Sequence, residues 1–224
     1  MTAYGRIAIL TLLALSLAFE LKAAPAKDRV FESDITLKEN FEIDGRPEGL
    51  TTTWVIKPGV TVSLDSISGS QLLTGIMFDH TGPAYFTVAG GGVLHSKRAR
   101  EFGIRLGHAI GRDGRSYGGP CTLVIEGGSI ARFDTEIAIF PSGGGISLKD
   151  AGSELQFLIR DDFSFDEQGS AFKGRSHYGG NGVIPVTING APVKLKGPDA
   201  NSSYSLRRVE GTVYRCLKVL PPNR

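Results

Sequence analysis

Two polar segments of the chain end in nearly the same residues. "RSYGG" begins at Arg115, and "RSHYGG" begins at Arg175. Arginine forms paired hydrogen bonds with carboxylate and phosphate-like anions, and a tyrosine ring offers a flat face on which a sugar can stack. If both segments leave the same side of the fold, they form a binding site for an anionic glycan. The residues predicted to bind are Arg115, Tyr117, Arg175, His177 and Tyr178.

Further basic residues precede the first of these segments. They are Lys97, Arg98, Arg100, Arg105 and Arg112, against the acidic Glu101 and Asp113. This cluster favours an anionic partner such as an acidic polysaccharide or a cell-surface glycan. Charged residues on loops can also serve solubility alone, so that alternative stays open.

Two adjacent carboxylates, Asp161 and Asp162, are candidates for catalysis. Glycoside hydrolysis uses one carboxyl group as the acid and another as the base or nucleophile. Neighbouring residues on a strand point to opposite faces, so this pair works only if a loop turns the two side chains together. His108 and His177 lack the spacing of metal ligands. We therefore predict a non-catalytic protein without a cofactor or metal, and a polysaccharide lyase or glycoside hydrolase is the alternative.

The elements that must position these residues repeat along the chain. "PAYFTVAGGGVLH" (83–95) and "PCTLVIEGGSIAR" (120–132) align without a gap and share a proline and two glycines, 37 positions apart. "WVIKPGVTV" (54–62) and "VTINGAPVKL" (186–195) are related to them. Each segment is a short run of β-branched and aromatic residues, a turn with glycine, and a second run, which predicts a strand, a tight turn and a strand.

Stacking of such units predicts an all-β protein of the β-solenoid type, with an antiparallel β-sandwich as the alternative. The 30 glycines of the chain suit frequent tight turns. Residues in excess of a compact coil are expected to leave the stack as loops, at 107–119 and 161–182. We expect a cap strand at about 30–45 and a closing hairpin at about 203–220, turning at Glu210 and Gly211.

The first residues of the chain are typical of a secretory signal. One positive charge, Arg6, precedes an apolar run at 7–19 that is too short to span a bilayer. Small residues follow, and we place the cleavage after Ala26. The prediction is a signal peptide at 1–26 and a single secreted domain at 27–224, with no later membrane span. The net charge of the whole chain is +2, which gives no reason to expect nucleic acid as a partner.

Two cysteines, Cys121 and Cys216, follow the predicted signal. In an exported chain such a pair can form a disulfide, and two buried free thiols are the equal alternative.

The segments "IEGGSI", "GGGISLKDAGSELQF" and "GVIPVTINGAPVKLKG" resemble exported bacterial β-solenoid proteins of the autotransporter-associated-repeat and PEP-CTERM type. The resemblance implies a single-stranded, right-handed parallel β-helix and an extracellular or cell-surface location, with the periplasm also open. The expected function is that of a surface, adhesive or extracellular-matrix module that binds anionic glycans, and a passive structural spacer is a further alternative.

Overall fold

The computed structural model is all-β, with no helix among the residues that it describes. It describes residues 28–38, 41–43, 50–65, 71–74, 82–98, 104–107, 119–135, 137–139, 143–158, 164–165, 171–173, 175–176 and 183–222. The predicted signal peptide at 1–26 lies outside these residues.

The strands form three sheets, which we call A, B and C. Sheet A contains β1 (Arg29–Phe31), β4 (Thr52–Ile56), β7 (Ala84–Val88), β10 (Cys121–Ile125), β13 (Gly144–Leu148), β18 (Val183–Ile188), β16 (Ala171–Lys173), β15 (Ser164–Phe165) and β19 (Ala191–Pro192). Sheet B contains β2 (Ile35–Leu37), β5 (Thr61–Asp65), β8 (Val93–Arg98), β11 (Ile130–Phe133), β14 (Glu154–Leu158), β21 (Thr212–Val219) and β20 (Ser202–Val209). Sheet C contains β3 (Phe41–Ile43), β6 (Gln71–Thr74), β9 (Ile104–Leu106), β12 (Ile137–Ile139) and β17 (Arg175–Ser176).

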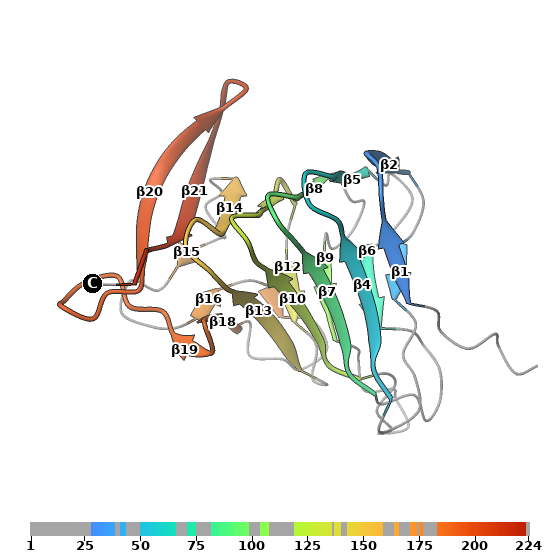
Figure 1. Ribbon diagram of the computed structural model, residues 1–224, viewed down its shortest axis with the longest axis horizontal. Coiled ribbons are helices and arrows are strands. Elements are labelled where there is room, and N and C mark those ends of the chain that lie inside the picture. The colour runs from blue at the N-terminus through green and yellow to red at the C-terminus, as the bar shows by residue number, and fades with distance from the viewer. Residues whose placement is uncertain are drawn as a thin grey trace, which may run out of the picture.

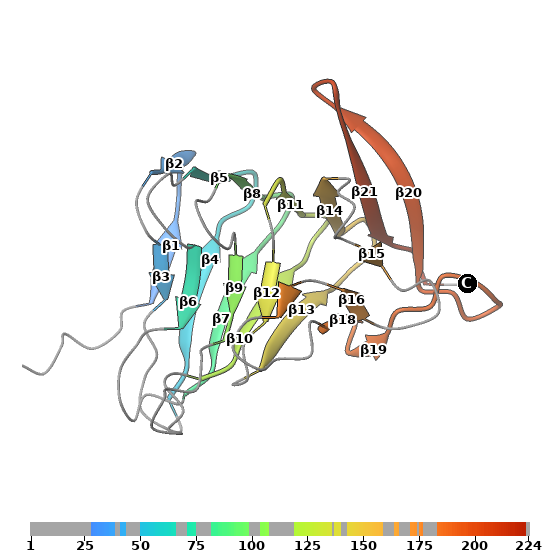
Figure 2. The same ribbon diagram turned by 180° about the vertical axis from the view of Figure 1, so that it is seen from behind.

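The chain passes from sheet A to sheet B to sheet C and then begins again one strand further along. β1, β2 and β3 form the first coil, and β4 to β6, β7 to β9 and β10 to β12 form the next three. Within these coils every pair of neighbouring strands is parallel. Figure 1 shows the strands of sheet A side by side along the long axis, and Figure 2 shows those of sheet C from behind. This arrangement is solenoid-like, and the parallel pairing excludes the alternative of an antiparallel sandwich.

The two proline-led segments lie against each other in the register that their sequences predict. Ala84 pairs with Cys121, Phe86 with Leu123 and Val88 with Ile125, so the offset of 37 positions is the offset between adjacent coils. By contrast, Cys121 pairs with Gly144, only 23 positions later. The longer coil is the one that contains residues 107–119, where the sequence predicts a loop.

Glycine is required where the coils turn from sheet A to sheet B. Gly90 and Gly127 have φ of 53° and 64°, in the left-handed region that other residues avoid. A Cβ on Gly127 would lie 2.8 Å from the backbone nitrogen of Gly90, so the corners of neighbouring coils are in direct contact. Ser129 completes this corner, because its hydroxyl oxygen accepts a hydrogen bond from the backbone N–H of Gly91 at 3.1 Å.

Apolar side chains from successive coils fill the interior of the stack. At the N-terminal end the rings of Phe31, Trp54 and Phe86 lie with their centroids 6.0 to 6.5 Å apart. Further along, Phe133 and Phe157 are stacked at 5.7 Å. These residues come from different coils, so burial of each aromatic side chain depends on the neighbouring coil.

Antiparallel strands end the parallel run at its C-terminal side. β21 pairs antiparallel with β14, and β20 pairs antiparallel with β21. The predicted hairpin is confirmed, and it turns at Glu210 and Gly211, where φ is 48° and 83°. At the other end, the segment predicted as a cap at about 30–45 contributes the three short strands of the first coil, each parallel to the strand of the next coil.

Candidate functional site

Most of the residues predicted to bind a glycan lie outside the described part of the chain. These are Arg115, Tyr117, His177 and Tyr178. The candidate catalytic pair, Asp161 and Asp162, lies outside it as well, and so does His108.

Arg175 is placed, because it is the first residue of β17 in sheet C. It pairs with Ala138 of β12, and Ala138 pairs with Arg105 of β9. Arg105, from the predicted basic cluster, and Arg175, one of the predicted binding residues, therefore occupy one row of the sheet. They are two strands apart, which corresponds to about 9.5 Å at the ordinary spacing of strands. The adjacent row contains the buried Leu106, whose side chain belongs to the core.

A second group of polar residues occupies the outer face of sheet B. Ser63, His95, Arg132, Gln156 and Cys216 form one row across five neighbouring strands. This row alternates with the core row, which contains Leu94 and Leu155. Neighbouring residues of a strand point to opposite faces, so the polar row lies on the side away from the core.

His95, Asp134 and Tyr214 form a hydrogen-bonded chain at one edge of this group. The His95 ring lies 2.9 Å from Oδ2 of Asp134, and the Tyr214 hydroxyl donates to Oδ1 at 2.7 Å. Burial alone would raise the pKa of Asp134. The hydrogen bonds from His95 and Tyr214, together with the charge of Arg132, outweigh burial and hold this pKa below its ordinary value of 3.8. Asp134 is therefore ionised at neutral pH, with both of its oxygens occupied.

Tyr214 is held in its protonated form by the same contact. Burial and the neighbouring Asp134 carboxylate raise the pKa of Tyr214 to about 12. The guanidinium carbon of Arg132 lies 5.3 Å from the centroid of the Tyr214 ring, within the range of a cation–π contact. Tyr214 thus joins the C-terminal hairpin to two residues of the fourth coil.

Arg132, Gln156, Glu154 and Arg207 form a second chain beside the first. Nε of Arg132 donates to Oε1 of Gln156 at 2.7 Å, and Nε2 of Gln156 donates to Oε1 of Glu154 at 2.9 Å. The Glu154 side chain is only 5% exposed, and Nη1 of Arg207 lies 3.0 Å from its Oε2. A buried carboxylate needs such partners, because a buried charge without a partner is strongly destabilising.

The two cysteines are buried free thiols in the structure and form no disulfide with each other. The sequence had left both arrangements open. Cys121 belongs to the core row of sheet A, whereas Cys216 belongs to the outer row of sheet B. Burial raises the pKa of each thiol to about 12, and for Cys216 the Glu154 carboxylate adds to this effect. The thiolate is the reactive form of cysteine, so neither residue is suited to act as a nucleophile.

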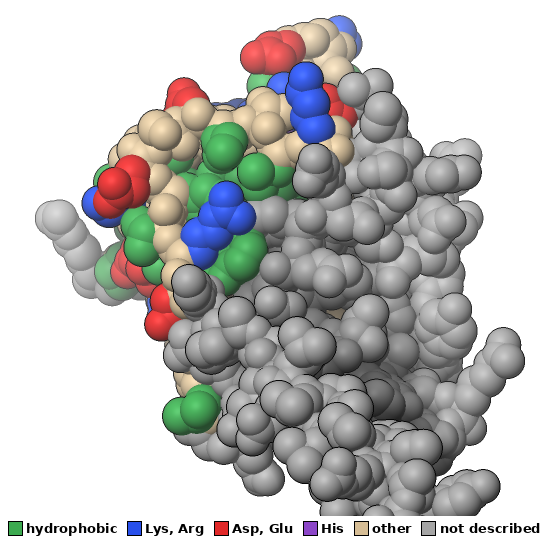
Figure 3. Space-filling model, turned by 90° about the vertical axis from the view of Figure 1, so that its right-hand side faces the viewer, with side chains coloured by type: hydrophobic (Ala, Val, Ile, Leu, Met, Phe, Trp, Pro, Cys, Tyr) green, Lys and Arg blue, Asp and Glu red, His purple; other side chains and the backbone are tan. Residues whose placement is uncertain are grey.

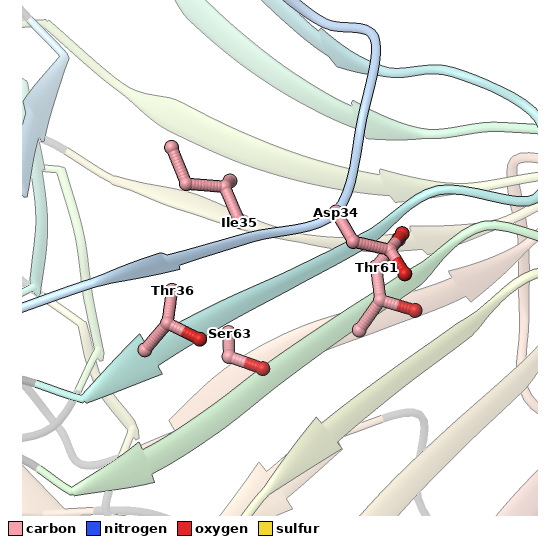
Figure 4. A pocket seen from close by; sticks show the side chains of 5 residues that line it. All are labelled: Asp34, Ile35, Thr36, Thr61 and Ser63. Carbon is pink, nitrogen blue, oxygen red and sulfur yellow. The ribbon is translucent and has the colours of Figure 1, made fainter.

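A shallow hollow of about 310 Å³ continues the outer face of sheet B toward the N-terminal end. Its walls are formed by Asp34, Ile35, Thr36, Thr61 and Ser63. Figure 4 shows the hydroxyl groups of the two threonines and the serine on one side of the sheet, with the Ile35 side chain on the other. One oxygen of Asp34 accepts a hydrogen bond from the backbone N–H of Thr61 at 2.7 Å, which joins the corner between β1 and β2 to the second coil.

Chemically, the outer face of sheet B is a set of satisfied ion pairs and hydrogen bonds. In the described residues no three side chains of His, Cys, Asp or Glu gather as ligands for a metal ion. The described part of the chain also has no helix that is long and apolar enough to cross a membrane. No protein-family model, curated protein or solved structure matches this chain significantly.

Sequence reasoning missed the outer-face group, although one signal for it was present. The gap-free alignment of 83–95 with 120–132 ends with His95 opposite Arg132, and these two residues are neighbours in the sheet. The contacts with Tyr214 and Arg207 carry no such signal, because the hairpin does not share the repeat.

Proposed function

We propose that this chain is an exported, non-catalytic β-solenoid that serves as a surface, adhesive or extracellular-matrix module and binds anionic glycans. The observation that supports this proposal best is the placement of Arg105 and Arg175 in one row of sheet C. Two arginines in one row of a parallel sheet suit a polymer that carries negative charges along its length. We further propose that the coils form a single-stranded, right-handed parallel β-helix. Connections between parallel strands of one sheet are nearly always right-handed, which supports this handedness.

The geometry of sheet B supports the non-catalytic part of the proposal. Both oxygens of Asp134 accept hydrogen bonds, and Glu154 is held by Gln156 and Arg207. A general acid or base must be able to reach the substrate and exchange its proton. Groups that are committed to one another in this way stabilise the fold instead.

The glycan proposal is tested by measuring the affinity of the purified protein for acidic and neutral polysaccharides of matched length. Arg105→Ala and Arg175→Ala are compared with Arg208→Ala, which removes an exposed arginine from the hairpin. A hydrogen bond to a charged group contributes about 1.5–3 kcal/mol. Each of the first two variants should therefore lose about tenfold or more in affinity for the acidic polymer.

Three results separate the proposal from its alternatives. Binding that is specific for the acidic polymers, weakens with added salt and survives Arg208→Ala supports it. Turnover of any polymer, abolished by Asp161→Asn or Asp162→Asn, would establish the glycan-active enzyme in its place. An affinity of the two variants equal to that of the unmodified protein, or no binding at all, would reject the arginine row and favour a structural spacer.

A further inference from the structure

Sheet B has a strand edge at each end that no described strand covers, although the backbone N–H of Ser202, at the start of β20, donates to the carbonyl oxygen of Lys194. Sheet B begins with β2 and ends with β20, and no described strand pairs with the outer edge of either. An open edge offers a row of backbone N–H and C=O groups to a further strand. Figures 1 and 2 place β2 and β20 at opposite ends of the long axis.

The two edges have the same strand direction. β21 is antiparallel to β14, and β20 is antiparallel to β21, so β20 runs in the same direction as β14. β2 also runs in that direction, because β2, β5, β8, β11 and β14 are all parallel. If one molecule is placed behind another along the stack, β20 of the first therefore meets β2 of the second in the parallel relation that joins the coils within each molecule.

Each of these two edge strands carries an exposed apolar side chain. Ile35 on β2 is 38% exposed and Leu206 on β20 is 64% exposed. The other large apolar side chains exposed in the described part of the chain are Val30 on β1, at the edge of sheet A, and Leu50 and Tyr85. Figure 3 shows the N-terminal end of the stack, where hydrophobic side chains surround a basic one and acidic ones lie near by. An exposed apolar end is expected of a coil that has no coil beyond it, and it favours a contact that covers it.

The apolar side chains of the two edges also belong to the same face of sheet B. Ile35 is in register with the core residue Val62. Tyr204 is in register with the core residue Leu217, and Leu206 is the next residue of β20 on that face. In a continued sheet, Leu206 and Ile35 would therefore lie on the inner side together.

We propose that copies of this chain associate head to tail, with β20 of one copy adding in parallel to β2 of the next, so that sheet B continues from molecule to molecule. Such a contact joins two different surfaces and leaves one free at each end, so it produces open linear assemblies and not closed dimers. The predicted cleavage after Ala26 fits this assembly, because it leaves only Lys27 and Asp28 ahead of β1. The proposal is independent of glycan binding.

The test uses the protein as the cell processes it, with its N-terminus determined by mass spectrometry. Mass in solution is measured by sedimentation velocity as a function of concentration, and negative-stain images show the shape of any assembly. Ile35→Lys blocks the β2 edge, and Leu206→Lys blocks the β20 edge, because a lysine on an edge strand opposes further pairing. Tyr85→Lys, at a residue that is 39% exposed on β7 in the middle of the stack, is the matched control.

We expect the unmodified protein and Tyr85→Lys to form rods whose mean length rises with concentration. Each edge variant alone should stay a monomer. An equimolar mixture of the two edge variants should form dimers and nothing longer, because only one intact edge of each kind is present, and this result also shows that both variants are folded. A monomer at all concentrations, or an assembly that survives both edge substitutions, would overturn the proposal.

Discussion

Substitution of Gly127 by alanine tests whether the coils contact each other as the structure has them. Its φ of 64° lies in the left-handed region, where a residue with a side chain costs about 1–2 kcal/mol. The new Cβ would also lie 2.8 Å from the nitrogen and 2.9 Å from the Cα of Gly90. These are backbone atoms of the adjacent coil and cannot rotate away, so the coils must separate. Overpacking of this kind costs about 1–3 kcal/mol more.

Gly128 provides the matched control, because it lies in the same turn. Its φ of 76° imposes a similar backbone cost, but a Cβ there would have no atom within 4 Å. Gly128→Ala should therefore lower the free energy of unfolding by about 1–2 kcal/mol, and Gly127→Ala by about 2–5 kcal/mol.

Urea denaturation of the two variants, followed by circular dichroism, measures this difference. At the size of this chain, 1 kcal/mol corresponds to about 2–4 °C in Tm, so thermal melts give an independent value. Equal destabilisation by the two substitutions would refute the reasoning, because it would mean that Gly127 does not contact the preceding coil.

Four further predictions concern the outer face of sheet B and the thiols. Tyr214→Phe should lower the free energy of unfolding by about 1 kcal/mol, because it removes the hydrogen bond to Asp134, and no loss in chemical denaturation would contradict that contact. The lowered pKa of Asp134 stabilises the fold above pH 3.8, and this contribution should disappear as the pH falls through the folded value; Asp134→Asn should flatten that acid limb. The pKa of Tyr214 is raised to about 12, so its contribution is complete below its ordinary value of 10.0 and should be lost between there and pH 12, as spectrophotometric titration can follow. Finally, Cys121 and Cys216 should resist iodoacetamide at pH 8 until the protein is unfolded, and rapid labelling of the native protein would contradict their burial.

The stack of coils could be predicted from the sequence because its cause is local and repeated. The second, third and fourth coils turn from sheet A to sheet B through a left-handed residue, so glycine recurs at Gly59, Gly90 and Gly127, and the apolar runs around these corners align. The related segment at 186–195 instead turns at Asn189 and Gly190 into the antiparallel pair of β18 and β19. A fixed offset then gives the register directly, as the pair of Phe86 with Leu123 shows.

The outer-face contacts could not be predicted, because they depend on which strand follows the last coil. Asp134 and Tyr214 are 80 positions apart, and no repeat relates them. Only the closing of the stack by an antiparallel hairpin brings the Tyr214 hydroxyl to that carboxylate. Charged residues alternate with core residues along a strand in the same way whether they face solvent or bind one another, so the sequence pattern does not distinguish the two cases.

The most direct test of the in-register stack is a cross-link between two adjacent coils on the outer face of sheet A. Tyr85→Cys and Thr122→Cys pair across β7 and β10 and lie about 4.8 Å apart, within reach of a disulfide. The control combines Tyr85→Cys with Ser147→Cys on β13, two strands away. Mild oxidation should close the first pair in nearly every molecule and leave the second open. A failure of the first pair to close, or equal closure of both, would contradict the parallel coils on which the account rests.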